Sequence, residues 1–233
     1  MTPAQSVWAT VIGTLVSACA LAYADLALPT QVLLSDYALV SGGLVPVLVG
    51  MLALAGACLC LAYGLAATEP ARTAAARVLL LAGAAGLMMS AVFPTDPGTS
   101  QIGTLSGEIH RWSAALVFTS LPVAGWVLAR GRRATPGWNA VRAMSMASAV
   151  ALAVYLAAHP ASFTSPLING AGYYGLLERA VVVGEMALLV AMALVAVAGR
   201  GTATAAVAPP EQAGAGAGRQ RRDEAGEPEQ LAA

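Results

Sequence analysis

The residues best suited to do chemistry gather in one polar stretch, Phe93–Arg111, which lies between two long apolar segments. It contains His110, one of two histidines in the chain, and an acid on either side of a Gly/Ser/Thr-rich loop, Asp96 and Glu108. A histidine beside a carboxylate is a common pair for general acid–base catalysis. His110, Asp96 and Glu108 are therefore the candidate catalytic residues, provided that the fold brings them together.

The same residues leave a metal site open as an alternative. His110 and His159, with Asp96 or Glu108, would supply the three protein ligands that a catalytic zinc usually has. However, no HxxxH or HExxH pair places two histidines on one helix face, and the three cysteines lack a metal-binding or disulfide spacing. We therefore assign no metal ligands and no cofactor from the sequence, and whether the chain is an enzyme stays open.

The elements that would position these residues are six apolar segments. Hydrophobic residues make up 58% of the chain and charged residues 10%, against about 25% charged in soluble domains. The zero net charge gives no indication of nucleic-acid binding. Each segment reaches about the 20 residues that cross a bilayer as a helix. The sequence predicts an all-α membrane protein, a bundle of six transmembrane helices over Ser6–Leu28, Gly42–Ala67, Ala74–Phe93, Glu108–Ala129, Asn139–Ala158 and Leu176–Ala198.

The arginines predict how the bundle lies in the membrane. Ten of the twelve fall in the second-to-third connection, around the fourth-to-fifth connection or after the sixth segment, while Arg111 and Arg179 fall at the opposite end. The positive-inside rule makes the arginine-rich side cytoplasmic, which predicts a multi-pass protein of the cell membrane with both termini in the cytoplasm. Residues 1–198 form the predicted transmembrane domain. Residues 199–233, rich in Ala, Gly, Pro and charge, form a predicted disordered tail.

The acids of the spanning region are all expected in its outer half, except Glu69. Glu185 lies well inside the sixth segment, and Glu178 shares its helix face. A charge at this depth needs a partner, and Arg111 is the expected partner of Glu178 or Glu185, although it can also pair with Glu108 at three-residue spacing in its own helix. The result is either an ion-pair network that holds helices together or an outward-opening polar pocket. The candidate binding residues are Asp36, Arg111, His159, Glu178, Arg179 and Glu185.

Three short motifs occur in order on this frame: Leu34-Ser35-Asp36-Tyr37 after the first segment, Phe93-Pro94-Thr95-Asp96 at the end of the third, and Gly107-Glu108-Ile109-His110 at the start of the fourth. From roughly Val7 to Ala198 the chain resembles a prokaryotic family of six-helix membrane proteins known as domain of unknown function 998. The resemblance implies a six-helix fold and supports the importance of the polar stretch, but it implies no particular activity.

Two classes of function fit these features best. The leading hypothesis is a binding, transport-associated or partner-interacting protein in the lipid bilayer, whose pocket takes a lipid or an amphiphilic small molecule. The alternative is a membrane-embedded hydrolase or transferase that acts on a lipid or lipid-linked substrate at the outer leaflet. An ion-coupled carrier using Glu185 and Arg111 has less support, because no internal repeat or broken-helix pair is evident. The oligomeric state stays open.

Overall fold

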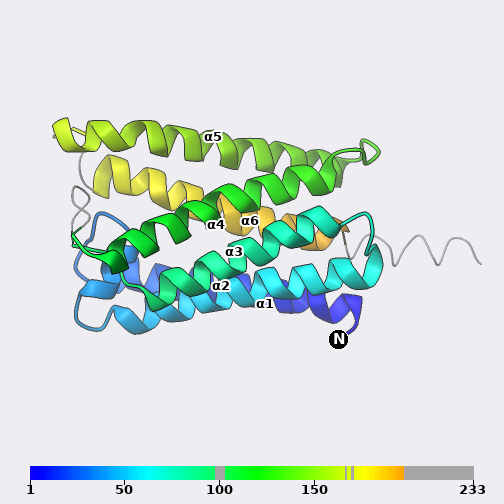
Figure 1. The fold of residues 1–233 in the computed structure, drawn as a ribbon, viewed down its shortest axis with the longest axis horizontal. Coiled ribbons are helices and arrows are strands. Elements are labelled where there is room, and N and C mark those ends of the chain that lie inside the picture. Colours follow the sequence, from blue (N-terminus) through cyan, green and yellow to red (C-terminus); the bar gives the residue numbers. More distant parts are fainter. Residues whose placement is uncertain (98–102, 166, 169–170, 197–233) are drawn as a thin grey trace, which may run out of the picture. The chain divides into compact units, whose positions relative to one another are not determined.

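The computed structural model describes residues 1–97, 103–165, 167–168 and 171–196, and within them every long element is an α-helix (Figure 1). The predicted tail, 199–233, lies outside the described residues. The six predicted helices are confirmed as α1 (Pro3–Ala27), α2 (Leu44–Thr68), α3 (Ala74–Val92), α4 (Leu105–Ala129), α5 (Pro136–Thr164) and α6 (Leu176–Ala196).

These helices have the composition of membrane spans. Their most apolar 18-residue windows have mean hydropathies from 1.5 to 2.5, and less than half of each window is buried inside the protein. Large apolar side chains such as Trp8, Leu26 and Val92 therefore stay on the outside of the bundle, where lipid would cover them. The chain is a multi-pass membrane protein.

The starts of α1 and α5 are set by capping residues, which the pattern of apolar residues does not reveal. The Thr2 hydroxyl accepts a hydrogen bond from the Gln5 amide while the Gln5 side chain accepts one from Thr2, a capping box that starts α1. Helix α5 begins earlier than predicted because Thr135 caps it and Pro136 occupies its first position. Both short helices, η1 (Ser35–Leu39) and the π-helical turn η2 (Ala171–Gly175), were missed by the sequence prediction.

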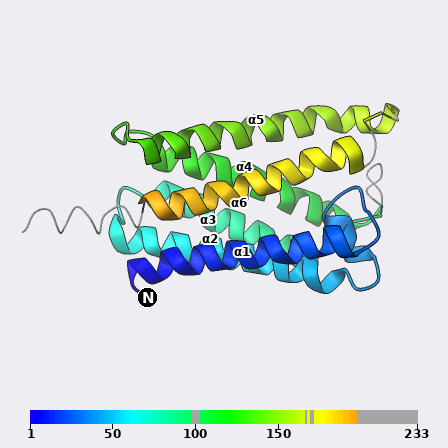
Figure 2. The same cartoon turned by 180° about the vertical axis from the view of Figure 1, so that it is seen from behind.

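The first four helices pack in chain order, each against the next, and α5 packs against α4. Helix α6 then returns through the bundle and contacts α1, α2, α4 and α5 (Figure 2). Close contact between α3 and α4 depends on Gly86, where an added Cβ would lie 2.7 Å from the Ser113 carbonyl oxygen. Because α6 packs against four other helices, its acidic residues Glu178 and Glu185 are buried in the bundle.

The bundle has two different ends. We call the end with the 28–43, 93–104 and 165–175 connections the pocket end, and the end with the 69–73 and 130–135 connections the arginine end. At the arginine end Glu69 forms an ion pair with Arg132, whose guanidinium also lies 4.8 Å from the centre of the Trp138 ring. These contacts tie the end of α2 to the start of α5. The candidate site residues predicted from the sequence lie in the half of the bundle nearer the pocket end.

Candidate functional site

A cavity of about 350 Å³ lies inside the pocket half of the bundle, and all six helices and η1 contribute to its lining. Its walls are mainly apolar, with Leu54, Leu87, Phe118 and Val182 among the lining side chains. Polar groups are few. The cavity thus combines the mostly hydrophobic wall and the small number of polar groups that are typical of sites for small molecules.

The cavity opens sideways between α4 and α5. Three of its lining residues, Arg111, Ala115 and Thr119, follow one another at four-residue spacing on α4 and are exposed. Leu156 of α5 also lines the cavity and is 55% exposed. Figure 1 shows that α4 and α5 diverge towards the pocket end, with α6 visible between them. The opening therefore lies along two helices that are long and apolar enough to cross a membrane.

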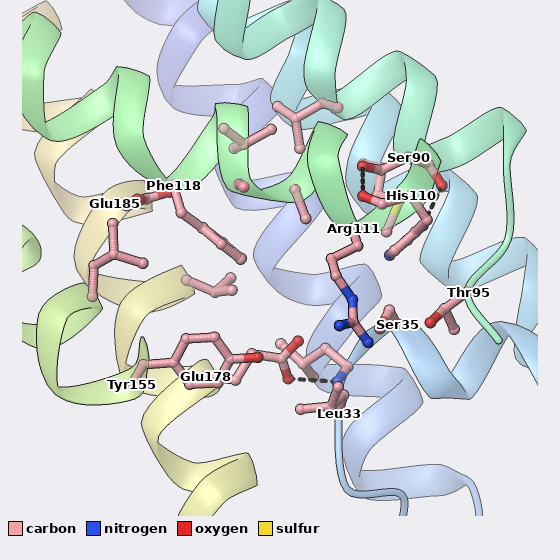
Figure 3. A pocket seen from close by; sticks show the side chains of 18 of the residues that line it. Leu33, Ser35, Ser90, Thr95, His110, Arg111, Phe118, Tyr155, Glu178 and Glu185 are labelled. Atoms are coloured by element: carbon pink, nitrogen blue, oxygen red, sulfur yellow. Dashed lines mark hydrogen bonds between the residues drawn. The ribbon is translucent and has the colours of Figure 1, made fainter. Parts of the chain in front are cut away.

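His110 is held by the end of α3. Its Nδ1 lies 3.1 Å from the Ser90 carbonyl oxygen and 2.9 Å from that of Phe93. Both partners are acceptors, so Nδ1 carries the proton and donates. In return the Ser90 hydroxyl donates to the His110 carbonyl oxygen at 3.5 Å. His110 therefore ties α4 to the last turn of α3 and borders the cavity (Figure 3).

The other two catalytic candidates do not contact His110. Asp96 accepts hydrogen bonds from the Gly103 and Thr104 amides and from the Thr104 hydroxyl at 2.8 Å, which closes the connection before α4. The Thr104 hydroxyl bond chiefly holds the pKa of the exposed Asp96 carboxyl below its ordinary value. Glu108 accepts from the Trp112 indole at 3.0 Å. No hydrogen bond joins His110 to either acid within the described part of the chain.

The second histidine belongs to an aromatic group on the opposite wall. His159 Nδ1 lies 2.6 Å from the Tyr174 hydroxyl, and the Tyr155 and Tyr174 rings stack with centres 4.8 Å apart. All three residues line the cavity. Sequence inspection missed Tyr155, since a single tyrosine in an apolar helix carries no local signal. Among the described residues no three His, Cys, Asp or Glu side chains are close enough to hold a metal ion.

Arg179 fastens α6 to the connection that follows α1. Its Nη2 and Nε donate to the Asp25 carboxylate at 2.6 and 3.1 Å, and its Nη1 donates to the Val32 and Gly175 carbonyl oxygens at 2.9 Å each. Asp25 also accepts from the hydroxyl of the fully buried Tyr37 at 2.9 Å. Arg179, a predicted binding residue, thus has its donors engaged within the protein.

Asp36 lies just outside the cavity, although its neighbour Ser35 lines it. The Asp36 carboxylate is buried and accepts from the Leu33 amide at 3.2 Å, which shapes the entry to η1. Burial raises the pKa of this carboxyl. Asp36 therefore supports the loop whose Leu33, Leu34 and Ser35 border the cavity.

The expected ion pair between Arg111 and Glu178 or Glu185 is wrong. The two ion pairs of the described residues are Glu69–Arg132 and Asp25–Arg179. Glu178 is 6% exposed and its carboxylate accepts from the Leu34 amide at 2.7 Å, so a backbone donor has taken the place of the arginine. Arg111 starts from the exposed edge of α4 and extends into the cavity, towards Glu178 and Leu33 (Figure 3), without an ion pair or hydrogen bond in this part of the chain.

Glu185 lies at the inner end of the cavity and is 2% exposed. Its Oε1 is buried without a hydrogen-bond partner among the described residues, and the hydroxyl of the cavity-lining Ser17 is in the same state. Sequence inspection singled out Glu185 but not Ser17. The signal for Ser17 was present as the small polar stripe Ser6, Thr10, Thr14 and Ser17, which α1 buries along one face.

Six apolar helices around a lined cavity define an α-helical multi-pass membrane protein with a cavity inside its spanning region. The chain belongs to the family described as Protein of unknown function (DUF998), whose model matches residues 6–195 and so includes all six helices. This confirms the resemblance inferred from the three short motifs. No curated protein and no solved structure matches the chain.

Proposed function

We propose that the protein binds a lipid-like amphiphile, which enters the cavity sideways from the bilayer between α4 and α5 and places an anionic headgroup at Arg111. The arginine end faces the cytoplasm in this proposal, so the pocket end faces outward and the ligand comes from the outer leaflet of the cell membrane. The protein acts by binding this ligand, without catalysis of its own.

The observation that carries the proposal is the state of Arg111. Its guanidinium borders the cavity and has no anionic partner among the described residues, whereas Arg179 at the same end of the bundle is paired with Asp25. An arginine kept at the edge of a hydrocarbon layer without a protein partner calls for an anion. A phosphate or carboxylate headgroup matches the planar fork of donors that arginine presents.

The shape and lining of the cavity support an apolar body for the ligand. Leu87, Phe118 and Val182 line its interior, and the sideways opening at Ala115 and Leu156 gives an acyl chain a path that never leaves the membrane. Burying each methylene of such a chain contributes about 0.8 kcal/mol. Binding therefore takes its affinity from the apolar walls and its headgroup preference from Arg111.

The enzymatic alternative has less support. The Nδ1 proton of His110 is donated to backbone carbonyls at the end of α3, which leaves Nε2 as the base nitrogen, but within the described residues neither Asp96 nor Glu108 is hydrogen-bonded to the ring as the sequence hypothesis required. Asp96 and Glu108 are engaged with Thr104 and Trp112.

Binding is tested with decanoate as the anionic probe and decanol as its uncharged counterpart. The protein is reconstituted in phosphatidylcholine nanodiscs, and empty nanodiscs are subtracted in isothermal titration calorimetry. We expect saturable decanoate binding that Arg111→Met weakens by about tenfold, the loss of one charge-assisted contact of about 1.4 kcal/mol. Decanol binding should be little affected by Arg111→Met. Arg133→Met, at the arginine end, is the matched control.

The entry route is tested with a pair of tryptophan substitutions on α4. Ala115→Trp places a large ring in the opening, whereas Leu116→Trp places the same ring on an exposed neighbouring position that does not line the cavity. We expect the first variant to abolish saturable binding of both probes and the second to leave it unchanged. The absence of saturable binding to the parent protein, or equal binding to both variants, would overturn the proposal.

A further inference from the structure

The inner end of the cavity holds two polar side chains that each have a buried oxygen without a hydrogen-bond partner among the described residues. Glu185 is 2% exposed and Ser17 is fully buried, and both line the cavity. Neither Glu185 Oε1 nor the Ser17 hydroxyl has a hydrogen bond within the described residues. Buried polar groups are satisfied in the great majority of cases, so two such groups in one cavity need an explanation.

Ser17 and Glu185 lie at nearly the same depth. Helices α1 and α6 run in opposite directions and are joined at the pocket end by the Asp25–Arg179 ion pair. Ser17 lies eight residues before Asp25, about 12 Å along α1, and Glu185 lies six residues after Arg179, about 9 Å along α6. The two side chains are thus within about one helical turn of the same level.

This level is the middle of the membrane-spanning region. The apolar span that contains α6 runs from Gly172 to Ala196, and Glu185 is at its centre. A carboxylate at mid-membrane depth is costly unless it is paired, and such residues are usually found facing a cavity with a functional partner. The two ion pairs of the described residues lie elsewhere, so the partner of Glu185 is not a protein cation in this part of the chain.

We propose that Glu185 and Ser17 form a deep polar subsite that binds a protonated amine at the inner end of the ligand. The amine donates one hydrogen bond to the Glu185 carboxylate and another to the Ser17 oxygen. This inference rests on the proposed function, because it assigns the far end of the same amphiphile.

The two subsites together define a class of ligand. Glu178, which faces Arg111 across the cavity, lies two turns before Glu185 on α6, so the rim and the deep subsite are about 10 Å apart along the helix. The ligand is therefore an amphiphile with an anionic group at one end, an apolar middle that crosses this distance, and an amine at the other end.

A binding role also predicts how the empty protein responds to mutation. Replacing an unsatisfied buried polar group by an apolar group of similar shape is neutral or stabilising, whereas removing a group with structural contacts is destabilising. Glu185→Met should therefore unfold at the same or a higher temperature than the parent when no ligand is added. A lower unfolding temperature would show that Glu185 has a structural partner and would overturn the assignment.

The deep subsite is tested with three probes that differ only at the far end of the chain: decanoate, ω-hydroxydecanoate and ω-aminodecanoate. Calorimetry in phosphatidylcholine nanodiscs gives their dissociation constants for the parent protein and for Glu185→Gln, Ser17→Ala and Glu108→Gln. Glu108 does not line the cavity, which makes its variant the control for loss of an acid elsewhere in the protein.

We expect the parent protein to bind ω-aminodecanoate about tenfold more tightly than ω-hydroxydecanoate, and the Glu185→Gln variant to lose this preference. Ser17→Ala should reduce the preference, and Glu108→Gln should keep it. Equal binding of all three probes to the parent, or an amine preference that survives in Glu185→Gln, would overturn the deep subsite. If none of the probes binds the parent protein, the proposed function itself fails, so the two failures are distinguishable.

Discussion

Two arginines at the pocket end give a sharp test of which polar contacts stabilise the bundle. Arg179 donates to the Asp25 carboxylate and to the backbone carbonyl oxygens of Val32, Gly175 and Gln31. Arg111 makes no hydrogen bond or ion pair in the described part of the chain. We therefore compare the same substitution at both positions, Arg179→Met and Arg111→Met, because methionine retains much of the apolar stem and removes the charge.

The size of the effect follows from the contacts. Hydrogen bonds to charged groups contribute about 1.5–3 kcal/mol each, and breaking a buried ion pair costs about 3–5 kcal/mol. The Asp25 side chain is 33% exposed, so water can replace part of what Arg179 supplies. We expect Arg179→Met to lower the free energy of unfolding by about 2–4 kcal/mol. Arg111→Met should change it by less than about 0.5 kcal/mol.

Thermal unfolding in detergent, followed by intrinsic tryptophan fluorescence, measures the difference. A domain of this size loses about 2–4 °C per kcal/mol, so Arg179→Met should unfold roughly 5–15 °C earlier than Arg111→Met. A double-mutant cycle with Asp25→Asn separates the contribution of the ion pair from that of the carbonyl contacts. Equal unfolding temperatures for the two methionine variants would refute the assignment of structural contacts to Arg179 and of none among the described residues to Arg111.

Three further predictions concern the pocket-end loop and the orientation of the chain. The pKa of the Asp96 carboxyl in the folded protein lies below its ordinary value of 3.8. The ionised carboxylate therefore contributes its full stabilisation above pH 3.8, and this stabilisation is lost as the pH falls through the folded-state pKa. Asp96→Asn should flatten this acid limb in unfolding curves, and an unchanged limb would contradict the loop contacts. Gly107→Ala should destabilise the protein by about 1–3 kcal/mol, because an added Cβ would overlap the Asp96 carboxylate, whereas Gly103→Ala should be neutral since nothing lies within 4 Å. In a cysteine-free background, a membrane-impermeant maleimide added to intact cells should label Leu105→Cys but not Ala134→Cys, and the reverse pattern would invert the proposed orientation.

The six helices could be predicted from the sequence because membrane insertion depends on the summed hydrophobicity of one continuous segment. Whether some 20 consecutive residues are apolar can be read without knowing what they contact. The predicted segments agree with the helices of the structure, but α5 begins earlier, where Thr135 caps it, and continues six residues past the predicted end, through Pro160 to Thr164. The position of the polar stretch around Asp96 and His110 at one end of the bundle could also be predicted, since polar residues between two spans must lie near a membrane surface or a cavity.

The partners of the polar residues could not be predicted in the same way. Adjacent helical residues point about 100° apart, so Glu178 and Arg179 face different neighbours. Which neighbours these are depends on how α6 is rotated against α1. The sequence contains both members of the Asp25–Arg179 ion pair, but it favoured Arg111 as the interhelical cation because Arg179 diverges from the adjacent Glu178 around the helix.

By itself, the sequence determined that this is a six-helix membrane protein of the DUF998 family, with most arginines towards one end of the spanning region and both histidines and most of its acids towards the other. The tertiary structure alone decided that Arg179 is paired with Asp25, that Arg111 lines a cavity without a hydrogen bond or ion pair among the described residues, and that Ser17 and Glu185 line the same cavity. The physical reason is that hydropathy adds up along a segment, whereas a cavity and its partners depend on the tilt and rotation of helices that are far apart in the chain.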